Sequence, residues 1–181
     1  MIDVKDPDRF KVSHEETVER WESIVEDIRS SVDYPSDHAT AASKMHPAVH
    51  EIIALQRTEG TDLEIRGELL YVLVTAIEAL IGRWIEQSDP VLTPLGAADK
   101  QIDINRELMR TKNQAYGSSW SIMRPEGLVD SIHTKIHRIE SLLSGVENRY
   151  ESVIDSFEDI LNYSVFACMR IDLDLEEGLN G

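Results

Sequence analysis

The longest apolar run in the sequence covers residues 69–85 (LLYVLVTAIEALIGRWI) and limits what the chain can form. A membrane-spanning helix needs about 20 apolar residues. This run is shorter, and the charged Glu78 lies within it. The preceding Thr61-Asp62-Leu63-Glu64 has the spacing of a capping box, which starts a helix. We therefore expect a long buried helix that ends at about Gln87, and with it an α-helical core.

Helix signals recur along the rest of the chain, whereas alternating strand patterns are weak. A second capping box lies at Ser13–Glu16, and proline and glycine residues separate the later apolar segments. The further helices that we expect cover about 13–33, 39–57, 98–114, 128–143 and 150–171. About six helices with short links predict an all-α helical bundle. We divide the chain into an N-terminal helical segment packed on the same core, a second helical region, and an acidic tail expected to fray, at residues 1–97, 98–172 and 173–181.

The balance of charged residues limits the classes of molecule that the protein is expected to bind. The net charge is −16, from 34 acidic and 18 basic residues, and such a field repels nucleic acid backbones. The first ten residues are charged and lack the apolar segment of a signal peptide, so we expect a cytoplasmic protein with no membrane or direct nucleic-acid partner. The single cysteine, Cys168, excludes a disulfide framework. Arginines outnumber lysines twelve to six, which together with the acidity suits a salt-rich cytoplasm.

The sign of the charge reverses between Arg106 and Arg138. This window holds six basic and only three acidic residues, so it is the part of the chain where an anion is expected. Lys135 and Arg138 are three residues apart and share a helical face, and arginine and lysine both bind phosphate oxygens. Lys112 and Asn113 end the preceding helix. Alternatively, these bases only neutralise the neighbouring acidic helices.

A loop with binding potential follows Lys112 and Asn113. Gly117 would permit close approach of the backbone to a ligand, and Ser119 offers a hydroxyl group. Tyr116 and Trp120 could stack on a base. The same residues would equally make an ordinary turn with an aromatic anchor.

Carboxylates gather on the last expected helix. Asp155, Asp159 and Asn162 stand at i, i+4 and i+7, on one helical face. Oxygen ligands with this spacing on a bundle helix could hold Mg²⁺, and Glu107 could add another carboxylate. The alternative is a solvated acidic stripe, or ion pairs with Lys135 and Arg138.

Two histidine pairs have the i, i+4 spacing that can bind zinc from one turn of helix. The pairs are His46 with His50 and His133 with His137. No HExxH pattern accompanies them, and the sequence identifies no third ligand. It also contains no GxSxG, P-loop or GxGxxG pattern.

Four short motifs resemble nucleotide modification associated domain 1, a family formerly catalogued as a domain of unknown function. The motifs are K-N-x-x-Y-G-x-S-W from Lys112, R-P-x-x-L from Arg124, K-x-x-R-I from Lys135 and D-x-x-x-D-x-x-N-Y from Asp155. The family is more distantly similar to the all-α NTP pyrophosphatases of the MazG-like group. The resemblance implies a role around free or modified nucleotides, and Mg²⁺-dependent cleavage of a nucleoside triphosphate to monophosphate and pyrophosphate.

Two hypotheses from different classes follow. In the first, the chain binds or hydrolyses a phosphorylated small molecule of the nucleotide class, and we expect it to form a homo-oligomer. The metal ligands would be Asp155 and Asp159, with Glu107 as a further catalytic carboxylate. The substrate would be held by Lys112, Asn113, Tyr116, Gly117, Ser119, Trp120, Arg124, Lys135, Arg138 and Asn162. In the second, the chain is a non-catalytic helical sensor or assembly module whose polar cluster only fixes the register of its helices.

Overall fold

A computed structural model describes residues 11–58, 60–87, 92–146 and 152–180. These residues form seven helices and no strand. The helices are α1 (His14–Arg29), α2 (His38–Arg57), α3 (Asp62–Gln87), α4 (Pro94–Tyr116), α5 (Ser119–Ile122), α6 (Pro125–Leu143) and α7 (Val153–Asn180). The expected all-α helical bundle is confirmed.

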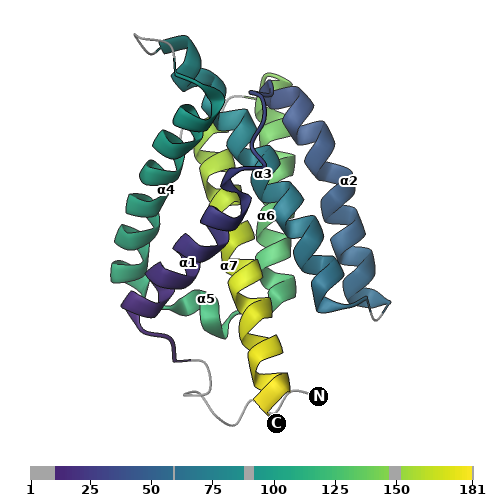
Figure 1. Cartoon of the computed structure of the whole chain (residues 1–181). Helices are drawn as coiled ribbons and strands as arrows, with labels where there is room; N and C mark the ends of the chain where they lie inside the picture. Colours follow the sequence, from purple (N-terminus) through teal and green to yellow (C-terminus); the bar gives the residue numbers. More distant parts are fainter. Residues whose placement is uncertain (1–10, 59, 88–91, 147–151, 181) are drawn as a thin grey trace.

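Four long helices make the centre of the bundle (Figure 1). Helix α7 packs against both α3 and α6, and α2 packs against the same two helices from the other side. Helices α1 and α4 pack on each other along one flank, where α4 contacts α3 and α1 contacts α7. The short α5 lies against α7 and joins α4 to α6. Segments far apart in the sequence therefore meet along α7.

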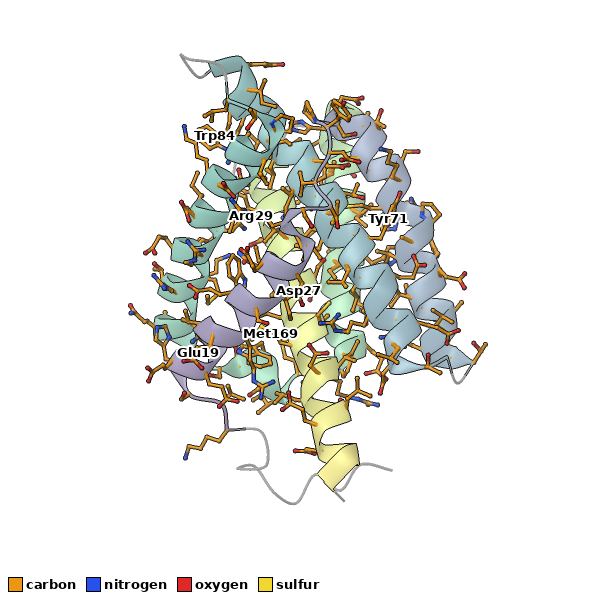
Figure 2. The ribbon with its side chains drawn as sticks, viewed as in Figure 1. Glu19, Asp27, Arg29, Tyr71, Trp84 and Met169 are labelled. Atoms are coloured by element: carbon orange, nitrogen blue, oxygen red, sulfur yellow. The ribbon has the colours of Figure 1, made fainter. Side chains whose placement is uncertain are left out.

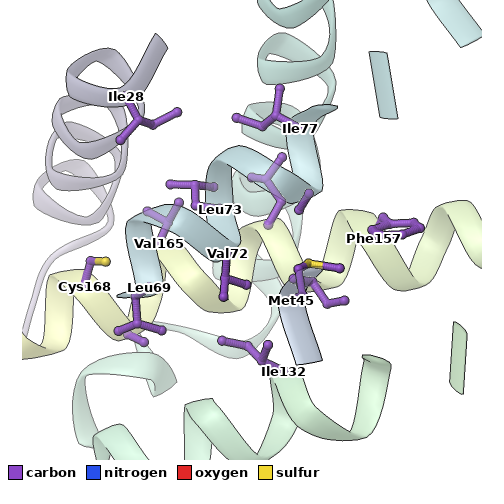
Figure 3. Close-up of a cluster of buried hydrophobic side chains, with 14 of the residues drawn as sticks. Ile28, Met45, Leu69, Val72, Leu73, Ile77, Ile132, Phe157, Val165 and Cys168 are labelled. Carbon is purple, nitrogen blue, oxygen red and sulfur yellow. The ribbon is translucent and has the colours of Figure 1, made fainter. Parts of the chain in front are cut away.

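Helix α3 contains the apolar run and supplies much of the core, as expected. Leu69, Val72, Leu73 and Ile77 are fully buried, and they face α7 residues such as Val165 (Figure 3). Their spacing of three and four residues puts them on one stripe of the helix, which is what burial against a partner helix requires. No described helix combines the length and the apolar character that a membrane span requires.

Both expected capping boxes start helices. The Ser13 hydroxyl accepts a hydrogen bond from the Glu16 backbone N–H at 3.0 Å, at the start of α1. At the start of α3, the Glu64 carboxylate accepts from the Thr61 backbone N–H at 2.8 Å, and the Thr61 hydroxyl accepts from the Glu64 N–H at 3.3 Å. Backbone donors that a helix leaves unpaired in its first turn are thereby satisfied.

Two expected boundaries are corrected. Helix α4 begins at Pro94, about one turn before the expected start, because proline fits the first turn of a helix and the Thr93 hydroxyl caps it. The segment after Gly117 is not only a turn, since residues 119–122 form α5. The expected start of the last helix, at Tyr150, falls on a residue outside the described part of the chain.

The expectation of a frayed acidic tail is wrong for residues 173–180, which continue α7. Ion pairs to other parts of the chain hold this end of the helix. Arg66 donates two hydrogen bonds to Asp172 at 2.8 and 3.2 Å, and Arg20 forms a bidentate ion pair with Glu176 at 2.8 and 2.9 Å. Asp172 and Glu176 are thus the partners of arginines on α3 and α1.

Candidate functional site

Three of the predicted site residues meet at one point of the bundle. Lys112 of α4 and Lys135 of α6 donate to the two oxygens of Asp159 of α7, at 2.7 and 2.8 Å. The side chains of Lys135 and Asp159 are 18% and 19% exposed, and that of Lys112 is 49% exposed. We call these three residues the lysine–aspartate cluster. It exists because α7 packs against both α4 and α6.

The lysine–aspartate cluster carries one net positive charge in a strongly acidic protein. Burial raises the pKa of the Asp159 carboxyl, but hydrogen bonds and positive charge from Lys112 and Lys135 outweigh burial, so the net shift is downward. Asp159 is therefore held ionised, and the two ammonium groups are held near each other. An incoming phosphate group would meet two cations and one anion.

A second polar network adjoins this cluster through Glu158, the neighbour of Asp159 in sequence. Arg83 of α3 donates to the Glu158 carboxylate and to the Gln101 side-chain oxygen, both at 2.8 Å. The Asn105 amide donates to the Glu158 backbone oxygen at 3.0 Å. Gln101 and Asn105 are fully buried, so this network fixes the register of α3 and α4 against α7.

Two buried amides from the predicted site are only partly hydrogen-bonded. Asn113 of α4 bonds through its nitrogen to the His14 ring at 2.8 Å, and Asn162 of α7 accepts from the Trp21 indole at 3.2 Å. The Asn113 side-chain oxygen and the Asn162 side-chain nitrogen have no hydrogen-bond partner among the described residues. Buried polar atoms are normally paired. An unpaired acceptor therefore lies on α4, the helix of Lys112, and an unpaired donor lies on α7, the helix of Asp159.

The loop residues separate into different environments. Gly117 has φ 64° and ψ −167°, a conformation that essentially only glycine adopts. Ser119 is exposed at the start of α5. Trp120 is 3% exposed, donates to the Thr17 hydroxyl at 3.3 Å and stacks on Phe166. Its ring therefore faces the core, where it is not exposed to stack on a base. The side chain of Tyr116 lies outside the described part of the structure.

Two predicted carboxylates are not brought to the lysine–aspartate cluster. Asp155 is exposed and caps α7, where its carboxylate accepts from the Ser152 backbone N–H and hydroxyl, both at 2.8 Å. Glu107 is 71% exposed and pairs with Arg110 at 3.0 Å. Since each residue turns an α-helix by 100°, Glu107 lies nearly opposite Lys112 on α4.

The two predicted arginines also differ in position. Arg138 is partly exposed on α6, one helical turn after Lys135. Arg124 is 77% exposed, and the Glu126 carboxylate is 3.7 Å from its Nε atom. Arg138 is therefore near enough along α6 to act with Lys135, whereas Arg124 sits on the surface before α6 begins.

A groove of about 700 Å³ between α1 and α4 was not predicted from the sequence. Glu19 and Arg29 line it from α1 (Figure 2), and Asp99 and Arg106 line it from α4. Arg29 forms a bidentate ion pair with Asp99 at 2.5 and 2.7 Å, so part of the acidic lining of the groove is already neutralised. No three carboxylates of the described residues approach one another closely enough to form a ready metal site there.

Comparison with known proteins bears on one part of the chain. No curated protein and no solved structure matches the sequence. The lysine–aspartate cluster, Asn113 and Asn162 all fall within residues 112–171. Those residues match the family model described as nucleotide modification associated domain 1, as the motifs of this segment predicted.

Proposed function

We propose that the lysine–aspartate cluster binds the phosphate groups of a small molecule of the nucleotide class. The observation that carries the proposal is the convergence of Lys112, Lys135 and Asp159 from three separate helices. Charge-assisted hydrogen bonds to phosphate are strong, and the cluster keeps one positive charge in excess. The family description of residues 112–171, which refers to nucleotide modification, supports this class of ligand.

Lys112 is the mobile member in this proposal. Its side chain is half exposed, so it can leave the Asp159 oxygen for a phosphate oxygen, whereas Lys135 is largely enclosed. Asn113 and Asn162, with one unpaired polar atom each, would serve the remainder of the ligand. Binding thus exchanges one partner of Lys112, and Lys135 stays beside Asp159 as the second cation that acts on the phosphate.

Magnesium is a further part of the proposal, with Asp155 and Asp159 as its candidate ligands. Both Asp159 oxygens accept hydrogen bonds from lysines, so an oxygen becomes available only when Lys112 moves to a phosphate. Mg²⁺ is commonly bound by one or two carboxylates together with substrate phosphates. When bound, it would neutralise phosphate charge and orient water.

Calorimetric titration with pyrophosphate and with nucleoside triphosphates, with and without Mg²⁺, tests the binding claim. Loss of one charge-assisted contact is worth about 1.5–3 kcal/mol, so Lys135→Met should weaken binding about 10-fold or more. Lys44→Met is the matched control, because Lys44 is an exposed lysine on α2. Equal affinities in the two variants, or no binding by the wild-type protein, would contradict the proposal.

Turnover is a separate question and needs its own assay. If the chain hydrolyses its ligand, pyrophosphate is released from the wild-type protein, and Asp159→Asn abolishes release while binding persists. Binding without release for all common and modified nucleotides would identify a nucleotide sensor instead of a hydrolase.

A structural role is the second candidate function. The low exposure of Lys135 and Asp159, and the adjoining Arg83–Glu158 pair, favour a polar network that sets helix register. Under this alternative, Lys135→Met lowers the free energy of unfolding by about 3 kcal/mol and no phosphate compound binds. Under the ligand-binding proposal, the same variant keeps most of its stability and loses the ligand.

The proposal also places the protein in the cytoplasm as a homo-oligomer. Tyr71 and Leu95 are among its exposed large apolar side chains, which a second copy could cover. Sedimentation equilibrium at micromolar concentration measures the mass directly. A monomer under those conditions would contradict the oligomeric part alone.

A further inference from the structure

Both histidine pairs of the sequence meet between α2 and α6. The His46 ring lies 4.7 Å from His50 and 5.2 Å from His137, and the His50 ring lies 5.1 Å from His133, all measured between ring centroids. Ring nitrogens of His46, His50 and His133 lie within 4.8 Å of one another. His133 and His137 approach through their Nε2 atoms at 3.0 Å. Three imidazoles from two helices therefore lie close enough to share an ion, and His137 lies beside two of them.

Glu140 orients two of these rings. One of its oxygens lies 2.9 Å from His46 Nδ1, and the other lies 3.2 Å from His137 Nδ1. A carboxylate accepts hydrogen bonds, so both Nδ1 atoms carry the proton and donate. In a neutral imidazole the Nε2 lone pair is then available. A carboxylate behind the far nitrogen of a histidine is the usual arrangement around a metal-bound histidine.

The spacing of the nitrogens fits a tetrahedral ion after small side-chain rotations. Zinc–nitrogen bonds of 2.0–2.1 Å at tetrahedral angles put ligand nitrogens about 3.3 Å apart. The distance between His133 Nε2 and His137 Nε2 is already close to this value, and the nitrogens of His46, His50 and His133 need to approach one another by up to about 1.5 Å. A hollow of about 660 Å³, lined by His46, His50 and Glu140, gives an ion access from solvent.

We propose that His46, His50, His133 and His137 form a binding site for a zinc-class divalent transition-metal ion. Glu140 acts as a positioning residue. Neutral imidazoles suit zinc, copper and nickel, whereas Mg²⁺ requires oxygen ligands, so the site is chemically distinct from the lysine–aspartate cluster. The bound ion links α2 to α6 across the surface of the bundle. The site does not depend on the proposed nucleotide function.

Metal titration of the full chain tests the proposal. After removal of adventitious metal with a chelator, calorimetry should show one Zn²⁺ per chain, and Co²⁺ should give the visible absorption of tetrahedral coordination. His50→Gln removes an exposed ligand with little risk to folding, and it should weaken binding at least 10-fold, as should His133→Gln. Glu140→Gln should weaken it about 10–100-fold.

His38→Gln is the matched control, because His38 also lies on α2 but packs on Phe157 outside the histidine group. Its Zn²⁺ affinity should equal that of the wild-type protein. Circular dichroism checks that each variant is folded, and Zn²⁺ but not Mg²⁺ should raise the Tm of the wild-type protein. Absence of Zn²⁺ binding, or equal affinity in His38→Gln, His50→Gln and His133→Gln, would overturn the proposal.

Discussion

Replacing Asp159 by asparagine gives the sharpest stability prediction. The change removes the negative charge to which both lysines bond, so Lys135, which is 18% exposed, loses its contact with the Asp159 carboxylate. Removing one partner of a buried ion pair costs about 3–5 kcal/mol, whereas an exposed pair contributes about 0.2–1 kcal/mol. Lys112 is 49% exposed, so its ammonium group can rotate towards solvent, and we expect the free energy of unfolding to fall by an intermediate amount of about 2 kcal/mol.

Urea unfolding followed by circular dichroism measures this loss. Asp103→Asn is the control, because its carboxylate is 70% exposed and its loss should change the free energy of unfolding by less than about 0.5 kcal/mol.

The pKa of Asp159 is lowered in the folded protein, so its contribution to stability is present above the unfolded pKa of 3.8 and disappears as pH falls through the folded pKa. The difference between wild type and Asp159→Asn should therefore be full at pH 7 and shrink towards pH 3. Equal unfolding midpoints for Asp159→Asn and Asp103→Asn at pH 7 would refute the reasoning.

Three further predictions concern other parts of the chain. Gly117→Ala should lower the free energy of unfolding by about 1–3 kcal/mol. The loss comes from the strained backbone conformation alone, because an added Cβ would meet no atom within 4 Å. An unchanged urea midpoint would contradict this. Burial raises the pKa of the Cys168 thiol to about 12, so a thiol reagent at pH 8 should label this residue only as fast as the protein unfolds. Rapid labelling of the folded protein would contradict this and would show that the core opens locally. The net charge of −16 should make Tm rise between low and molar KCl, and a flat or falling Tm would remove the inference of a salt-rich habitat.

The fold could be predicted largely from local signals. Capping boxes and apolar spacing identify where α1 and α3 begin, because both depend on residues within one helical turn. The early start of α4 was missed because Pro94 was interpreted as a loop residue, although proline is also favoured in the first turn of a helix. The helical C-terminus was missed because its stability depends on Arg20 and Arg66, which are distant in sequence.

The candidate site was predictable in part. Ion pairs of the last helix with Lys135 and Arg138 were one expected alternative, and the Lys135–Asp159 pair is of this kind. The pairing of Lys112 with Asp159 was not expected, because it depends on the packing of α4 against α7. Burial of Trp120 did not follow, because an aromatic residue in a turn can face either a ligand or the core. Both histidine pairs were recognised from spacing, but nothing local indicates that α2 packs against α6, and so the shared site and Glu140 were missed.

The central claim is that Lys112, Lys135 and Asp159 act together on one phosphorylated ligand. A double-mutant cycle with Lys112→Met, Lys135→Met and the combined variant, measured as Kd for a nucleoside triphosphate, tests it most directly. Both single variants should bind about 10-fold or more weakly, and their effects should not add, because the two ammonium groups share one ligand. Affinities that stay at the wild-type value in all three variants would contradict the claim.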